Sequence, residues 1–286
     1  MWVDVDGGRL QLQTSGRESR QGSAILLLHG WPLDHRVFEP QIRYLERDFR
    51  VIAFDRRGFG QSEAPPSLHR ELDDIDRILE TLNLKTVHLL GMSQGARIAL
   101  RFAVTRPERI RSLILQAPVI DGIALDESES ERIPMEEFAM LARAGRLEEV
   151  RRRWLDHPMM ALGAGRARLR RRVEEIVADY QGKDLLEYSP ASHTFSHDVL
   201  ARLSRLGRAC LILTGAHETA TRREHARRLL ESVPRSREIV FRHSGHLSNL
   251  TEAKVYNREV ADFCASIDGS AQEPETPKRS SAPHRK

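Results

Sequence analysis

Short apolar runs alternate with amphipathic helical stretches through the first 116 residues, and this alternation constrains the fold more than any other feature of the sequence. Each apolar run is brief and continuous, as expected for a strand that is buried on both faces. The expected strands cover residues 24–28, 50–54, 86–90 and 110–116. The expected helices between them cover residues 36–47, 68–82 and 93–104. Strands that alternate with helices predict an α/β fold with a mostly parallel, doubly wound sheet.

Both ends of the chain extend this pattern. Residues 1–6 and 9–13 alternate apolar and polar side chains on either side of a Gly-Gly turn, which predicts a hairpin. Two further strands are expected at residues 210–214 and 238–241. Two further helices are expected at residues 223–233 and 249–267.

The pattern changes between residues 119 and 206, where helical segments follow one another without a buried strand. These segments cover residues 134–144, 147–154, 167–180 and 197–206. We expect a helical cap over residues 119–206, inserted after the strand that ends near Gln116, on a core built from residues 1–118 and 207–267. Residues 268–286 are rich in Ser, Pro, Glu and Lys without apolar periodicity, which predicts a disordered tail.

The charge pattern argues against a nucleic-acid partner. The chain carries a net charge of +4, and its basic residues are mostly arginines interleaved with Asp and Glu. Interleaved charges are typical of solvated helix faces rather than of a basic binding surface. With 40% hydrophobic and 30% charged residues, the composition fits a packed soluble core.

The sequence also bears on the compartment. No apolar run approaches the ~18 residues of a membrane span, and the N-terminus lacks the basic and apolar regions of a signal peptide. Cys210 and Cys264 lie in apolar stretches, as buried free thiols of a reducing compartment do. We therefore expect a cytoplasmic protein, and the sequence leaves its oligomeric state open.

The pentapeptide Gly91-Met92-Ser93-Gln94-Gly95 falls between an expected strand and an expected helix. A serine on such a turn has its hydroxyl lifted clear of the backbone, and the flanking glycines let neighbouring chain pass close by. This placement makes Ser93 a candidate nucleophile, provided that a histidine and a carboxylate reach it from elsewhere.

The candidate base is His246, which follows a late strand in the stretch Ser244-Gly245-His246. His243 stands nearer the strand end and fits a surface or packing role better. The candidate acid is Glu218, which follows the preceding strand, because the chain order is then Ser, acid, His. Asp121, which follows the strand ending near Gln116, is the alternative acid.

An acyl-transfer site also needs donors for the oxyanion, usually backbone N–H groups. Gln94 directly follows the serine at a helix N-terminus, whose dipole favours anions. The second donor is expected from Trp31, in the stretch His29-Gly30-Trp31-Pro32 that ends the most apolar strand. Pro32 cannot donate and stiffens this loop.

No motif predicts a cofactor or a metal. The stretch from Asp55 to Ser62 contains G-x-G but lacks the third glycine of a dinucleotide-binding turn, so we expect Asp55 and Arg57 to hold loops. His193 and His197 are four residues apart but lack the acidic residue of an H-E-x-x-H site.

These segments together resemble the α/β-hydrolase fold in its single-domain form with a helical cap. The resemblance rests on His29-Gly30-Trp31-Pro32, the Asp55–Ser62 turn (family pattern D-x-R-G-x-G-x-S), Gly91–Gly95, Gly215–Glu218 and Gly245-His246. These motifs follow the family's order across residues 24–265. They imply the fold and a Ser–acid–His triad, whereas they say little about the substrate.

The chain departs from the family's pattern in two places. Glu218 stands where the family usually carries aspartate, and the stretch between Ser62 and the helix near Leu68 is short. Haloalkane dehalogenases and epoxide hydrolases share the His-Gly-x-Pro stretch. They use an aspartate nucleophile where this chain has Ser93, which argues against both activities.

The resemblance implies a cofactor-independent serine hydrolase that cleaves a carboxylic ester of a small molecule. The cap would select the acyl chain, with Trp154, Met159 and Met160 as pocket candidates, although packing within the cap explains each of them better. The arginines of the cap helices are only a weak indication of an anionic substrate, because most arginines on such helices are simply solvated. Two alternatives stay open: cleavage of a carbon–carbon bond or perhydrolysis by the same serine, and a non-enzymatic small-molecule receptor.

Overall fold

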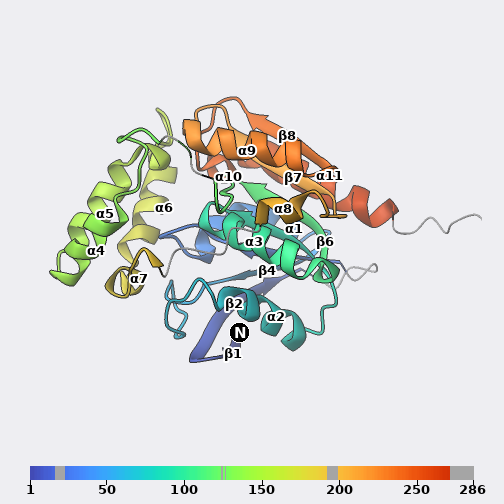
Figure 1. Cartoon of the computed structure of the whole chain (residues 1–286), viewed down its shortest axis with the longest axis horizontal. Helices are drawn as coiled ribbons and strands as arrows, with labels where there is room; N and C mark the ends of the chain where they lie inside the picture. The colour runs from blue at the N-terminus through green and yellow to red at the C-terminus, as the bar shows by residue number, and fades with distance from the viewer. Residues whose placement is uncertain (17–22, 124, 126, 192–198, 271–286) are drawn as a thin grey trace, which may run out of the picture.

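A computed structural model describes residues 1–16, 23–123, 125, 127–191 and 199–270. A single eight-stranded sheet runs through the molecule, in the order β1-β2-β4-β3-β5-β6-β7-β8 (Figure 1). The strands are β1 (Trp2–Val5), β2 (Gly8–Ser15), β3 (Ala24–Leu28), β4 (Arg50–Phe54), β5 (Val87–Met92), β6 (Ile110–Gln116), β7 (Cys210–Gly215) and β8 (Ser236–Phe241). The hairpin β1–β2 and the pair β2–β4 are antiparallel, and all pairs from β4 to β8 are parallel. The predicted mostly parallel sheet is confirmed.

Helices cover both faces of the sheet because successive side chains of the buried strands point to opposite sides. In β3, Ile25 and Leu27 belong to one apolar cluster, and Leu26 and Leu28 belong to another on the opposite face. The first face is covered by α1 (Glu39–Leu45), α10 (Ser248–Thr251) and α11 (Ala253–Ser270). The second face is covered by α2 (Glu71–Thr81), α3 (Gln94–Thr105) and α9 (Ala220–Ser232). A short 3-10 helix, His35–Phe38, precedes α1.

Four helices between β6 and β7 stand apart from the sheet at one side of the molecule (Figure 1). They are α4 (Met135–Arg143), α5 (Leu147–Asp156), α6 (Ala167–Ala178) and α7 (Lys183–Leu186). Their buried side chains join the apolar cluster that contains Trp31, whose ring contacts the ring of Trp154 at a centroid distance of 4.7 Å. The indole Nε1 of Trp31 also donates to Asp184 Oδ2 at 2.8 Å. The loop after β3 is therefore anchored to the cap.

Two expected boundaries differ from the structure. The helix α8 (Val199–Leu203) lies within the stretch expected as cap, yet it packs on α3 and α9, because Val199 and Leu203 are buried in the core cluster of that face. The cap helices therefore end at α7.

The last helix also continues further than expected. It runs to Ser270, where the expected tail begins at residue 268, because the Asp268 side chain is buried against His88 and Arg111. The remaining expected tail, residues 271–286, lies outside the described residues.

The structure also bears on membrane-spanning helices and on the two cysteines. None of the described helices is long and apolar enough to cross a lipid bilayer. Cys210 and Cys264 are both buried free thiols, and burial raises the pKa of Cys210 to about 12. Both thiols are therefore held in their neutral, unreactive form.

Candidate active site

Ser93 lies on a sharp turn between β5 and α3, as the sequence predicts. Its backbone has φ 54° and ψ −116°, a strained conformation for a residue with a side chain. The flanking glycines are required by close packing. A Cβ atom at Gly91 would lie 2.4 Å from the carbonyl oxygen of Gly95, and one at Gly95 would lie 2.3 Å from that of Leu28. The turn thus fixes Ser93 at the carboxyl end of the central strands.

The loop after β3 packs directly against this serine. A Cβ atom at Gly30 would lie 3.2 Å from Ser93 Cβ and 3.8 Å from its Oγ. The amide of Trp31, the next residue, therefore belongs to the immediate surroundings of the hydroxyl. The backbone of Ser93 is also held in place, because its N–H donates to the carbonyl of Gln116 at 2.8 Å.

Two backbone amides beside Ser93 are open. Gln94 is the first residue of α3, so its N–H has no acceptor within the helix. Within the described ranges, neither this amide nor that of Trp31 has a hydrogen-bond acceptor. The side chain of Gln94 is turned to another partner, since its Oε1 accepts from Arg56 at 2.8 Å. The two amides can therefore donate to an oxyanion formed at Ser93.

Glu218 and His246 are in direct contact. His246 Nδ1 lies 2.9 Å from Glu218 Oε2, and both residues are 4% exposed. The other carboxylate oxygen of Glu218 accepts from Thr219 N–H at 2.9 Å. Burial acts to raise the pKa of Glu218, but the charge and hydrogen bond of His246 outweigh it and lower that pKa below its usual value. A charged Glu218 can hold the imidazole in the tautomer that carries the proton on Nδ1.

The loops that carry these two residues are packed on each other. A Cβ atom at Gly215 would lie 2.3 Å from the carbonyl oxygen of Gly245, and the N–H of His217 donates to Ser244 O at 2.9 Å. The Nε2 atom of His246 makes no hydrogen bond with any described residue, Ser93 included. This nitrogen is consequently open to exchange a proton.

Asp121, the alternative acid, is engaged elsewhere. Its Oδ1 lies 2.6 Å from Arg97 Nε, and its Oδ2 lies 3.3 Å from Arg101 Nη1. Both arginines belong to α3. Asp121 is therefore paired with side chains of that helix and not with the histidine. The geometry favours Glu218 over Asp121 as the partner of His246.

Gln116, at the end of β6, joins the serine and histidine loops. Its carbonyl accepts from Ser93, and its side-chain amide donates to the carbonyl of His246 at 2.8 Å and to Asn249 Oδ1 at 3.1 Å. Its Oε1 accepts from Tyr256 Oη at 2.9 Å. No sequence motif marks this residue. Its signal in the sequence is a polar side chain at the end of an otherwise apolar strand.

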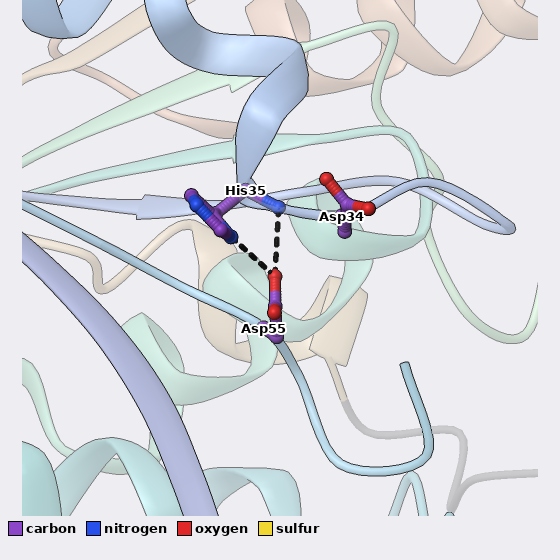
Figure 2. Close-up of side chains that lie close together, drawn as sticks. All are labelled: Asp34, His35 and Asp55. Atoms are coloured by element: carbon purple, nitrogen blue, oxygen red, sulfur yellow. Dashed lines mark hydrogen bonds and ion pairs between the residues drawn. The ribbon is translucent and has the colours of Figure 1, made fainter. Parts of the chain in front are cut away.

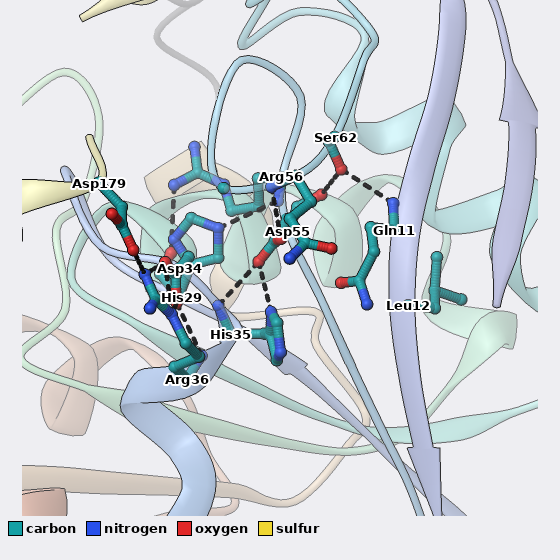
Figure 3. A network of polar contacts seen from close by, with 12 residues as sticks. Gln11, Leu12, His29, Asp34, His35, Arg36, Asp55, Arg56, Ser62 and Asp179 are labelled. Carbon is teal, nitrogen blue, oxygen red and sulfur yellow. Dashed lines mark hydrogen bonds and ion pairs between the residues drawn. The ribbon is translucent and has the colours of Figure 1, made fainter. Parts of the chain in front are cut away.

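A second polar network joins the loops that follow β3 and β4 (Figure 3). His29 Nδ1 lies 2.9 Å from the carbonyl oxygen of Gly30, and its Nε2 accepts from the N–H of Arg56 at 3.0 Å. Burial and the charge of Arg56 lower the pKa of His29 to about 3, so its ring is neutral. The guanidinium of Arg56 makes two 2.6 Å bonds to Glu71. His29 therefore braces the loop that presents Gly30.

Asp55 is a loop-holding residue, as the sequence predicts (Figure 2). Its Oδ1 accepts from the backbone N–H of His35 at 3.0 Å and lies 2.6 Å from that residue's Nδ1, while its Oδ2 accepts from Gln61 N–H. Asp34 lies in the same group and is bound by Arg36. Both carboxylates of this cluster thus already accept hydrogen bonds from protein groups. Arg57 likewise makes two 2.6 Å bonds to Asp74.

The remaining candidates have other surroundings. His243 is exposed, and its carbonyl accepts from Arg166, which fits the expected surface role. Met159 and Met160 are buried in the apolar cluster that contains Trp31. Trp154 packs in the same cluster and also lines a cavity. His193 and His197 lie outside the described residues.

That cavity adjoins Ser93 and Gln94 and has a volume of about 230 Å³. Its walls are mainly apolar, built by Trp31, Val119, Ile133, Met135, Trp154 and Tyr188. Two cationic side chains, Arg97 and Arg222, also line it. A space of this size between core and cap can accept a small organic molecule.

Comparisons with known proteins agree with this fold. The putative carbamate hydrolase RutD of Agrobacterium fabrum is 27% identical over 91% of this chain and 99% of its own length. Two solved structures share the fold. One is a thermophilic esterase from Thermogutta terrifontis, with TM-score 0.79, 20% identity and coverage of 94% of this chain and 98% of its own. The other is an esterase from Exiguobacterium antarcticum, with TM-score 0.75, 24% identity and coverage of 92% and 98%.

The family model for the alpha/beta hydrolase fold matches residues 23–253. This range contains the turn at Ser93 and the loops that carry Glu218 and His246. It also contains all four cap helices. The chain belongs to the alpha/beta hydrolase fold family.

Proposed function

We propose that this protein is a serine hydrolase that cleaves carboxylic esters of small molecules through a Ser93–His246–Glu218 triad. The observation that carries the proposal is the 2.9 Å contact between Glu218 and His246 Nδ1, which leaves Nε2 of the ring open. Gln116 joins the loop that carries His246 to the strained turn at Ser93. A serine hydroxyl needs such an oriented base, because it is a weak nucleophile at neutral pH.

In the proposed reaction, the Ser93 Oγ forms a bond to the carbonyl carbon while its proton passes to His246 Nε2. Glu218 stabilises the imidazolium that forms. The carbonyl oxygen becomes an oxyanion, which accepts hydrogen bonds from the amides of Trp31 and Gln94. Collapse breaks the bond to the alkoxy group, which takes the proton from His246 and departs as an alcohol.

Hydrolysis then regenerates the enzyme. A water molecule gives a proton to His246 and bonds to the acyl carbon, and the second oxyanion occupies the same two amides. The bond to Ser93 Oγ breaks, and the serine recovers the proton from His246 while the carboxylic acid leaves. The carbonyl of a carbamate, which the name of the RutD relative indicates for that protein, is open to the same attack.

A panel of p-nitrophenyl esters with rising acyl length tests the proposal. We expect turnover to pass through a maximum, because the cavity of about 230 Å³ limits the acyl chain. The Ser93→Ala variant is the matched control and should be inactive on every ester. A folded protein that binds the esters without turning over any of them would instead indicate a receptor.

A further inference from the structure

The cavity beside Ser93 is lined by two arginines that differ in their partners. The guanidinium of Arg97 forms a 2.5 Å ion pair with Asp121, a carboxylate that it shares with Arg101. Arg222 also lines the cavity, on the first turn of α9. Its guanidinium has no hydrogen-bond or ion-pair partner in the described part of the chain. The guanidinium of Arg222 therefore lines a mainly apolar cavity without a bonded anion among the described residues.

The position of Arg222 is fixed by its backbone. Its N–H donates to Thr219 Oγ1 at 3.4 Å, the side-chain cap that begins α9. Glu218 and Glu127 attract Arg222 only through space, and Glu218 is already bonded to His246 and Thr219. Burial acts as the main influence lowering the pKa of Arg222, yet guanidinium remains charged at any physiological pH.

A buried charge without a bonded partner is unfavourable, because it loses its hydration and the attraction of Glu218 and Glu127 through space offsets that loss only in part. A ligand anion can supply the missing partner. Guanidinium groups prefer carboxylates, which they bind through two parallel N–H···O bonds. Trp154 lines the same cavity, and its indole Nε1 is a buried donor without an acceptor among the described residues.

We propose that Arg222 binds a carboxylate carried by the substrate, so that the protein prefers small esters with an anionic group at one end of an otherwise apolar body. The inference rests on the proposed ester hydrolysis at Ser93. It identifies Arg222 as a specificity-determining residue of the core, distinct from the arginines on the surface of the cap.

The test compares two esters that differ only in charge: 4-nitrophenyl hydrogen adipate and its methyl ester. We expect the wild-type kcat/KM to be higher for the carboxylate. In Arg222→Gln this preference should fall by about 10- to 100-fold, the usual range for a lost bond to a charged group. Arg222→Lys should restore part of it, because the positive charge returns without the planar fork.

Arg228→Gln is the matched control. It removes the same charge from the same helix, at a side chain that is 46% exposed and paired with Glu224. The control should keep the wild-type preference for the carboxylate. Equal losses on both esters in Arg222→Gln would overturn the inference, because Arg222 would then act on Glu218 and not on the substrate.

Binding of adipate without turnover separates this inference from the proposed function. Calorimetry with Ser93→Ala protein should show adipate binding that weakens by the same factor in the Ser93→Ala, Arg222→Gln double variant. Hydrolysis of the neutral ester with no carboxylate preference contradicts the inference alone. Failure to hydrolyse either ester, with Arg222-dependent binding of adipate retained, contradicts the proposed function alone.

Discussion

The side-chain amide of Gln116 donates a hydrogen bond to the backbone carbonyl of His246 at 2.8 Å. The backbone carbonyl of Gln116 accepts from Ser93 N–H at the same distance. One residue at the end of β6 therefore sets the spacing between the Ser93 turn and the His246 loop. Because Gln116 is fully buried, it positions both loops without touching a substrate.

Gln116→Met should disturb this spacing. The substitution removes both side-chain donors and the acceptor for Tyr256, and each buried polar group left unpaired costs about 1–3 kcal/mol of stability. We expect kcat for an ester to fall at least tenfold while KM changes little, since Gln116 does not line the cavity. Steady-state kinetics and urea unfolding measure the two effects.

Tyr256→Phe is the control for this prediction. It removes the 2.9 Å bond to Gln116 Oε1 but leaves the bond to His246 in place. It should therefore lower stability and spare kcat. A similar fall in kcat in both variants would show that Gln116 acts through general stability and not through the position of His246.

The assignment of Glu218 leads to a paired test with Asp121. Glu218→Gln leaves Nδ1 of His246 without a charged partner and should lower kcat by about 10³–10⁴, as expected when the acid of a triad loses its charge. Asp121→Asn removes the partner of Arg97 and Arg101, so it should mainly reduce the free energy of unfolding. Reversed effects on kcat would make Asp121 the acid.

His29 predicts a pH dependence of stability. Burial and the Arg56 charge lower its pKa from 6.5 to about 3. Between these pKa values the unfolded chain binds a proton at His29 that the folded chain does not bind. The contribution of the neutral His29 to the free energy of unfolding is therefore complete above pH 6.5 and is lost as the pH falls below it. The contribution is up to about 1.4 kcal/mol per pH unit for one proton.

The measurement is urea unfolding of His29→Asn and of the wild type at pH 7.5 and pH 5.5. The variant should be less stable at pH 7.5, because the Arg56 N–H loses its imidazole acceptor. It should also lose less stability on acidification. His157 and His225 have lowered pKa values as well, so the slope should become shallower without vanishing. An unchanged slope would mean that His29 is protonated alike in both states.

Most of the sheet could be predicted from sequence because its strands are short apolar runs separated by amphipathic helices. The expected strand 24–28 coincides with β3, and the expected strand 110–116 coincides with β6. The position of α8 against the core could not be predicted, because helical spacing does not tell which surface a helix packs on. Only the contacts of Val199 and Leu203 with the core decide it.

The site could be predicted in part for a similar reason. The turn at Ser93 and the contact of Glu218 with His246 follow local motifs at strand ends, which the sequence displays. Gln116 and Arg222 were missed because their roles depend on distant segments. In the sequence, Arg222 is indistinguishable from its exposed neighbour Arg223.

The central claim is that Ser93 is the nucleophile, and reaction of the whole protein with a fluorophosphonate tests it most directly. Intact-mass and peptide mass spectrometry should show one adduct per chain, on the peptide that contains Ser93. The adduct should be absent from Ser93→Ala and should form far more slowly in His246→Ala. A folded protein that forms no adduct, or an adduct that persists in Ser93→Ala, would contradict the account.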